Sequence, residues 1–421
     1  MRYWECRRLP NLIGHCNTPQ KKVAGAFFVL VQGGVAGVDC AAVRKGTLPP
    51  SELMAGSQRI KSIDAVRATA LLLILLAHCV VAYGAQHVDG DGAADSVAWW
   101  LFDYVFLGNG FLMFSFLFGL SFFFQMDHAE AKGIDFRGRF CWRLVLLLLF
   151  GVIHNAFYRS DILMIFALAG FVPVLYHKVR TKWILLACVL LLVQPVPLME
   201  AVQRCAGTWV EPPHDPAVDP ASLWDAMRDN STKWLVWKAQ YQWDSGRLFY
   251  TLAMFMLGTV TGRLRIFEQP RARHLPRIAA WGAVFLAVML GVETALPETE
   301  AFSGFHGYVQ NWRQVATVCC FIPLLAWLYD RPRLQRFLRP LYSVGRCTLT
   351  AYITQGIILT LLFFQYGLGW GLATTAADRV LIGLVFFAAQ TAFFTWWLGR
   401  FKYGPLEGVW RRLTRIGMKQ G

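Results

Sequence analysis

Arg67 and His78 have the residue types and the spacing that most directly suggest chemistry in this sequence. His78 lies inside the apolar run LLLILLAHCVV, eleven residues after Arg67. Eleven residues of an α-helix return to almost the same face, about 16 Å further along the axis. A buried imidazole can act as a general base near neutral pH. We therefore expect one helix face to carry a guanidinium near its inner edge and a catalytic His78 in its outer half. The structural alternative is that His78 only hydrogen-bonds another helix, and that Arg67 only anchors the helix end.

His154 and Asp161 form a second candidate pair, around the end of one apolar segment and the start of the next in FGVIHNAFYRSDI. A carboxylate that orients a histidine makes it a usable general base. Alternatively, Asp161 caps the following helix and His154 lies at the headgroup level.

Asp64, four residues before the first apolar segment, is expected to cap that helix, with pairing to Arg67 as the alternative.

Gln355 and Arg346 are candidate substrate-binding residues. Gln355 lies near the middle of the apolar segment GRCTLTAYITQGIILTLLF, where a polar side chain either hydrogen-bonds another helix or contacts a substrate. Gln390, in the last apolar segment, is expected to serve packing. Arg346 and the basic loop 263–277 would attract a polyanionic ligand at the inner face.

The composition requires these residues to lie in a membrane protein. Of the 421 residues, 56% are hydrophobic and only 16% are charged, whereas soluble domains average about 45–50% and 25%. A soluble enzyme and a disordered chain are therefore excluded. A helix crosses the hydrocarbon core with about 20 apolar residues, which predicts an all-α integral membrane protein of about ten transmembrane helices in one bundle. The predicted segments are 68–84, 108–126, 141–157, 161–177, 183–199, 247–264, 278–296, 311–329, 345–366 and 380–399.

The net charge of +15 is explained by topology rather than by a nucleic-acid partner. Most Lys and Arg residues fall on alternate connections, as the positive-inside rule requires when both ends of the bundle are cytoplasmic. The segment 97–107 is expected to form an interfacial helix, separated from the next span by a break at 108–110. Residues 154–161 are expected to connect two spans as a tight helix hairpin.

The chain is predicted to have three parts. Residues 1–57 are expected to be poorly ordered, or to precede the natural start at Met54. Residues 58–415 form the membrane domain, and residues 416–421 form a cytoplasmic tail. The outer loop 200–246 contains an amphipathic helix, which is expected either to lie in the interface or to act as a lid. The ten cysteines include no C-x-x-C pair, so we expect no metal site.

Several segments of the sequence, in order, resemble the YeiB-like family of bacterial inner-membrane proteins, a domain of unknown function numbered 418. The segments that carry the resemblance are RIKSIDAVRATALLLILLAH, FSFLFGLSFFFQMDHAEAKGIDFRGRFCWRLVLLLLFGVIH, SDILMIFALAG, GRCTLTAYITQGIILTLLFFQYGLG and YGPLEGVWRRLT. Together they extend over most of residues 58–415. The resemblance implies a multi-pass protein of the bacterial inner (plasma) membrane.

This family is similar to transmembrane acyltransferases, in which an Arg and a His share the first helix, as Arg67 and His78 do. The resemblance implies that Arg67 lies near an acyl-CoA donor and that His78 is the catalytic base. Many YeiB-like proteins have Asn near this position, so His78 is closer to the enzymes. We therefore expect acyl transfer from cytoplasmic acyl-CoA to a hydroxyl of an envelope glycan or lipid, with no resident cofactor. The alternative is a transporter or flippase for a lipid-linked or anionic solute.

Overall fold

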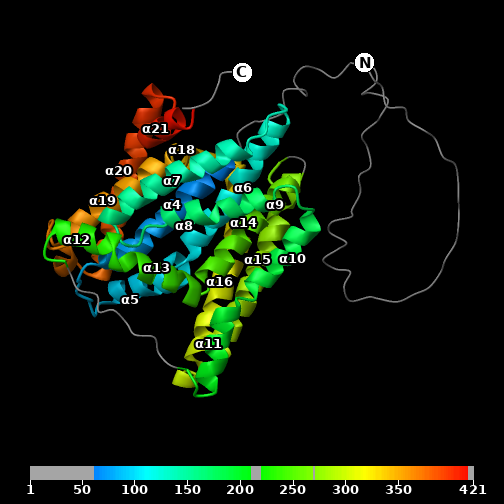
Figure 1. Cartoon of the computed structure of the whole chain (residues 1–421). Helices are drawn as coiled ribbons and strands as arrows, with labels where there is room; N and C mark the ends of the chain where they lie inside the picture. The colour runs from blue at the N-terminus through cyan, green and yellow to red at the C-terminus, as the bar shows by residue number, and fades with distance from the viewer. Residues whose placement is uncertain (1–60, 210–219, 269–270, 416–421) are drawn as a thin grey trace, which may run out of the picture. The chain divides into compact units, whose positions relative to one another are not determined.

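The computed structural model describes residues 61–209, 220–268 and 271–415, and the regular structure in these ranges is helical (Figure 1). The predictions for residues 1–57 and 416–421 lie outside the described residues. The principal helices are α4 (Lys61–Val80), α5 (Ala93–Leu101), α6 (Asn109–Glu130), α7 (Arg137–Phe157), α8 (Leu163–Ala169), α9 (Phe171–Tyr176), α10 (Thr181–Leu192), α11 (Pro195–Cys205), α12 (Leu223–Ser231), α13 (Lys233–Asp244), α14 (Arg247–Arg263), α15 (Leu275–Ala295), α16 (Ser303–Tyr329), α17 (Pro332–Leu338), α18 (Leu341–Arg346), α19 (Thr348–Phe363), α20 (Ala376–Arg400) and α21 (Pro405–Leu413).

Seven helical stretches in the described part of the chain are long and apolar enough to cross a membrane, which identifies a membrane protein. They are Lys61–Val80, Ala93–Glu130, Arg137–Phe157, Thr181–Cys205, Arg271–Ala295, Glu300–Tyr329 and Ala376–Arg400. The other three predicted spans are also helical but shorter. They correspond to α8 with α9, to α14 and to α19. The number of ten spans therefore stays a prediction.

Breaks in the backbone occur where Gly, Pro or an unusual conformation interrupts an apolar run. The predicted break before α6 is confirmed, because Gly108 has a φ of 74° and the preceding five residues are π-helical. Gln194 has a φ of 50° and separates α10 from α11, which starts with Pro195. The predicted amphipathic helix of the loop 200–246 is divided at Thr232 into α12 and α13.

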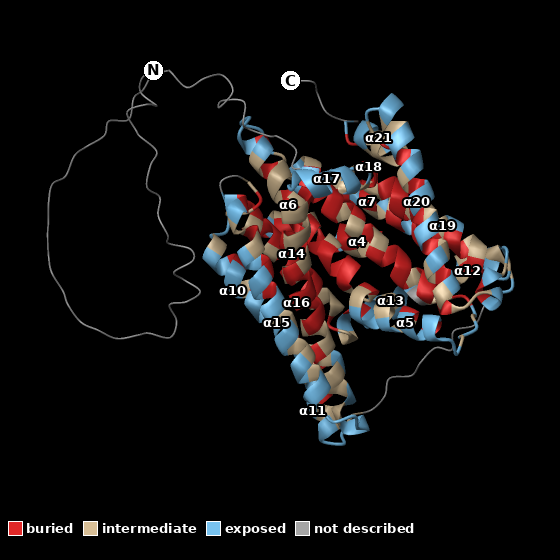
Figure 2. Ribbon diagram, turned by 180° about the vertical axis from the view of Figure 1, so that it is seen from behind, coloured by how far each residue is buried: buried red, intermediate tan, exposed pale blue. Residues whose placement is uncertain are grey.

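The helix α4 is central and α15 is peripheral. In its most apolar window, 78% of the α4 residues are buried inside the protein, compared with 17% for α15. Figure 2 shows this contrast, with buried residues along α4 and exposed residues along α10 and α15. An apolar helix that buries little of its surface against protein is expected to face lipid. The residues of α4 are therefore positioned by protein contacts on most sides.

Helices α6 and α14 cross with their backbones in close contact. A Cβ atom added to Gly119 would collide with the carbonyl of Phe255, and one added to Gly258 would collide with the carbonyl of Phe116. Thr259 Oγ1 donates a hydrogen bond to the Gly119 carbonyl at 3.3 Å. Small residues that allow such contact are the usual basis of helix packing in membranes.

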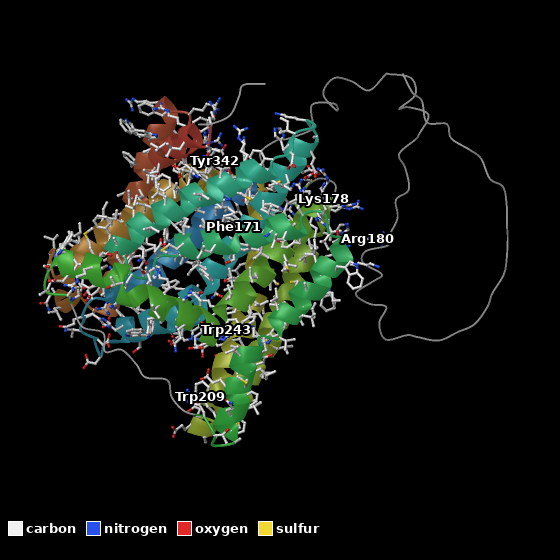
Figure 3. The ribbon with its side chains drawn as sticks, viewed as in Figure 1. Phe171, Lys178, Arg180, Trp209, Trp243 and Tyr342 are labelled. Atoms are coloured by element: carbon white, nitrogen blue, oxygen red, sulfur yellow. The ribbon has the colours of Figure 1, made fainter. Side chains whose placement is uncertain are left out.

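The two ends of the bundle are defined by α12 and α21, and α7 runs between them. At one end, Arg143 of α7 lies 4.2 Å from the ring of Trp410 in α21. At the other, Asn155 donates a hydrogen bond to the carbonyl of Asn230 in α12. We call these the α21 end and the α12 end. In Figure 3, Lys178 and Arg180 lie far from Trp209 and Trp243.

The helix α21 folds back and caps α19. Glu407 Oε1 accepts hydrogen bonds from the backbone N–H groups of Leu349, at 2.7 Å, and Thr350, at 3.0 Å. Its Oε2 accepts one from the Thr350 hydroxyl at 2.7 Å. The first N–H groups of a helix lack intrahelical partners, and a carboxylate there is stabilised by the helix dipole. Glu407 thus fixes the α21 end of α19.

Candidate functional site

His154 and Asp161 form a fully buried pair at the α12 end. His154 Nδ1 lies 2.7 Å from Asp161 Oδ1, and both side chains have no exposed surface. The other carboxylate oxygen accepts a hydrogen bond from the N–H of Met164 at 3.1 Å, in the first turn of α8. Asp161 therefore caps the first turn of α8 with one carboxylate oxygen and contacts the imidazole of His154 with the other. The pairing with His154 and the capping of α8, which were alternative predictions from the sequence, occur together.

The predicted hairpin between α7 and α8 brings this pair together. Gly151 lies against Met164, and Gly170 lies against Leu144, so α8 and α9 pack antiparallel to α7. A Cβ at either glycine would be within 3 Å of these neighbours. The absence of a side chain on both glycines lets the helices approach, and the short turn between them places Asp161 beside His154.

A row of aromatic rings connects His154 to His78. The ring centroid of Tyr158 lies 5.9 Å from His154 and 5.2 Å from His78. Tyr83 lies 5.4 Å from His78 and 5.0 Å from Tyr158. The structure therefore brings the three predicted catalytic residues, His78, His154 and Asp161, into one cluster. Their catalytic roles stay predictions.

The backbone after α4 is strained where it positions Tyr83. Ala82 and Tyr83 have φ values of 47° and 57°, in the left-handed region that non-glycine residues rarely adopt. Such strain persists only where the surrounding structure enforces it, and it is often found at functional sites. His78 itself remains partly accessible, although its neighbours along α4 are mostly buried. The sequence analysis did not identify Tyr83 or Tyr158; the only signal for Tyr158 was its position between His154 and Asp161.

The helices α12 and α13 are attached to the cluster by polar contacts. Two hydrogen bonds join α7 to α12. Asn155 donates to the carbonyl of Asn230, and Asn230 Nδ2 donates to the carbonyl of Ala156 at 3.0 Å. Lys238 Nζ donates to Asn155 Oδ1 and to the Asp161 carbonyl. Burial lowers the pKa of Lys238 to about 8, although the Asp161 charge opposes this shift. The amphipathic segment thus covers the cluster.

A small cavity of about 20 Å³ opens beside the row of rings, with room for about one water molecule. Tyr83 and Tyr158 form part of its wall. The other lining residues are Phe157, Arg159, Pro220, Ala226, Asp229, Asn230, Thr360, Phe364 and Tyr366. The cavity therefore lies between the cluster and the α12 helix.

His154 Nε2 is buried without a hydrogen-bond partner and faces α19. A Cβ atom at Gly356 would overlap with this nitrogen, so only glycine fits there. The preceding residue, Gln355, donates a hydrogen bond to Gln390 Oε1 at 2.9 Å, and its own Oε1 is buried without a partner. Gln355 therefore lies on the helix that contacts the cluster, and its pairing with Gln390 fits interhelical packing as well.

Arg67 lies toward the opposite end of α4 from His78. Its guanidinium contacts Asp64 Oδ1 at 2.6 Å and Ser121 Oγ at 2.5 Å. Asp64 was expected mainly to cap α4, and the structure shows the alternative, an ion pair with Arg67. The eleven-residue spacing places Arg67 and His78 about 16 Å apart along the helix, so they cannot act on the same atoms directly.

Arg346 belongs to the α21 end. Its Nη2 donates a hydrogen bond to the Lys402 carbonyl at 2.7 Å, and its guanidinium lies 5.6 Å from the Tyr342 ring. A surface hollow of about 240 Å³ at the same end is lined by residues that include Arg137, His177 and Lys178. The predicted site residues thus divide into a histidine cluster at the α12 end and basic residues at the α21 end.

Metal binding has no support in the ranges that the structure describes. No group of three or more His, Cys, Asp or Glu side chains there could hold an ion. The side chains of the histidine cluster can take part in proton transfer and hydrogen bonding.

Comparison with known proteins finds relatives whose function is undefined. The family model described as protein of unknown function (DUF418) matches residues 261–417. The chain resembles this family over that segment. It is 29% identical to the uncharacterized protein YxaH of Bacillus subtilis, over 72% of this chain and 79% of that protein. It is 26% identical to the uncharacterized protein YeiB of Escherichia coli, over 85% and 96% of the two chains.

A third relative extends over a similar length. It is an uncharacterized 39.9 kDa protein of Bacillus acidopullulyticus, encoded in the amylase 3′ region. It is 25% identical over 85% of this chain and 94% of its own. These matches confirm the YeiB-like resemblance, and they identify no activity.

Proposed function

We propose that this protein is an acyltransferase of the bacterial inner membrane, which moves an acyl group from cytoplasmic acyl-CoA to a hydroxyl of an envelope glycan or lipid. The main support is the row of rings that connects the buried His154–Asp161 pair to the partly accessible His78. Ionisable side chains held at this depth in a helix bundle are costly and usually functional.

In this reaction, His78 takes the proton of the acceptor hydroxyl while the oxygen attacks the thioester carbonyl carbon. The new C–O bond forms, the C–S bond breaks, and CoA leaves as a thiolate that takes up a proton. Tyr158 lies between the two histidines, so His154 and Asp161 act through it to position His78. A positioned general base of this kind typically contributes about 10²–10⁴-fold in rate.

The donor would bind from the α21 end. Arg67 is at that side of α4, and Arg346 lies near the C-terminal helix. Guanidinium groups bind phosphate groups well because their donors match phosphate geometry. If the pantetheine arm of CoA extended along α4 from Arg67, it would carry the thioester toward His78. Gln355, on α19, is then placed to contact the donor or the acceptor.

The decisive experiment is transfer from radiolabelled acetyl-CoA, or a longer acyl-CoA, in membranes that contain the protein. His78→Ala and His78→Asn should each lower turnover by about 10²-fold or more, with expression and Tm near wild type. His177→Asn is the matched control, because His177 pairs with Glu130 at 2.8 Å at the other end of the bundle. An active His78→Asn protein would refute a general base at this position, since an amide cannot accept the proton at neutral pH.

Transport is the second candidate function, and one observation favours it. Asp161, His154, Tyr158 and His78 form a continuous series of titratable groups, and such series form proton pathways in transporters. Uptake of protons coupled to an anionic or lipid-linked solute in proteoliposomes, with no acyl transfer, would support this alternative.

A further inference from the structure

Arg247 is a second cation at the α12 end, besides Lys238, and the proposed reaction does not use it. It is the first residue of α14, and its guanidinium lies 4.2 Å from the ring of Phe111 and 5.9 Å from the ring of Tyr241. Tyr241 belongs to α13, the helix whose Lys238 donates a hydrogen bond to the carbonyl of Asp161. The position of Arg247 was not apparent from the sequence, where it stands at the edge of an apolar run.

Arg247 is partly buried, and its partners differ from those of the fully buried Arg313 and Arg379. Arg313 pairs with Glu293 at 2.8 Å. Arg379 lies 3.6 Å from Asp89 and donates to the Thr374 carbonyl. Among the described residues, Arg247 interacts with tyrosines and pairs with no carboxylate. Its Nε is buried and has no hydrogen-bond partner.

A cation in this position requires a negative partner that the described residues do not supply. Removing a charge from water costs several times what a cation–π contact returns. The N-terminus of α14 adds to the positive potential there, because its N-cap residue, Gly246, offers no side chain to cap the first N–H groups. These features favour a bound anion.

We propose that Arg247 binds an oxyanion of the substrate, a carboxylate or a phosphate group, beside His78. This inference deepens the proposed function, because the oxyanion would belong to the acceptor and would hold its hydroxyl at the base. Arg247 is then a binding residue. The planar guanidinium, which rests on Phe111 and leaves Nε–H unused, suits the two oxygens of such a group.

The test is the Tm of the full chain in detergent, measured at constant ionic strength with inorganic phosphate, with octanoate, or with chloride alone. We expect one oxyanion to raise the wild-type Tm by at least about 2 °C near saturation. A rise with phosphate alone would identify a phosphate-bearing substrate, and a rise with octanoate alone a carboxylate. A rise with neither would overturn the proposal.

Arg247→Met and Arg313→Met are the matched pair of variants. Both replace an arginine that lies over an aromatic ring, but only Arg313 has a carboxylate partner. Arg247→Met should abolish the oxyanion effect and leave the ligand-free Tm equal or higher. Arg313→Met should lower the Tm, because Glu293 is left unpaired, and should keep the effect. An oxyanion effect that persists in Arg247→Met would overturn the proposal.

The two proposals fail separately. If phosphate or octanoate stabilises the wild type through Arg247 but no acyl transfer is found, the oxyanion site stands and acyl transfer is refuted. If acyl transfer is found but neither phosphate nor octanoate raises the Tm, acyl transfer stands and the oxyanion site is refuted.

Discussion

Lys238 is a titratable residue that joins α13 to the turn carrying Asp161, and its burial has a consequence for stability. Burial lowers its pKa from 10.5 to about 8. Between these two pH values the unfolded chain holds the Lys238 proton more often than the folded protein does. Stability rises with pH wherever the unfolded state binds more protons. We therefore expect this residue to raise the Tm as the pH increases from about 8 to 10.5.

The measurement is the Tm across this pH range for the wild type and for Lys238→Met. The difference between the two curves isolates Lys238, because the other titrating groups are shared. Lys182→Met is a suitable control, since Lys182 lies over the Trp183 ring at the start of α10. A wild-type curve parallel to that of Lys238→Met would refute the assignment.

At the scale of single residues, the sequence was sufficient to predict a contact where the two partners are close along the chain. His154 and Asp161 flank a turn too short to separate them, and Arg67 and Asp64 are one helical turn apart. It was insufficient for Tyr83, Tyr158 and Arg247, because their positions around the histidine cluster depend on how separate segments pack. Apolar periodicity identifies a helix and its buried face, but it does not specify which residue of another helix lies opposite.

At the scale of elements, the α6–α14 crossing is sensitive to side-chain size. Gly119→Ala places a methyl group against the backbone carbonyl of Phe255, which cannot rotate away. Overpacking of this kind costs about 1–3 kcal/mol, so the Tm should fall. Gly291→Ala in α15 is the control, because no atom lies within 4 Å of an added Cβ there.

The control variant should be neutral or slightly stabilising, since Ala is a better helix former than Gly by about 1 kcal/mol. The comparison requires only a thermal melt of each purified protein. If Gly119→Ala melted at the wild-type temperature, the two helices would be shown to separate without cost.

The sequence could not predict this crossing, because Gly119 and Gly258 are two of 36 glycines and nothing in their local sequence distinguishes them.

At the scale of the whole molecule, the three shorter apolar helices determine the topology. The N-terminus of α19 is capped by Glu407 at the α21 end, and its last residue, Phe363, stacks on Tyr83 at the α12 end. The helix α14 starts near His78, and Arg263, at its end, donates to the carbonyl of Val179. The helices α8 and α9 start beside Asp161 and end near Glu130. Each of the three thus runs from one end of the bundle to the other.

We therefore predict that these three helices also cross the membrane, for ten spans and a C-terminus on the cytoplasmic side. A helix of 17 residues, such as α14, is about 25 Å long, and a bilayer thins locally around a short span at modest cost. A reporter fused after Gly421 should be active only in the cytoplasm, and one inserted at Glu298, between α15 and α16, only outside. Each reporter is the control for the other, because a fusion that disturbed the insertion of the protein into the membrane would alter both reporter activities. An external C-terminus would make the number of spans odd, and the broken pair α8 and α9 would then be the first helices to remove from the count.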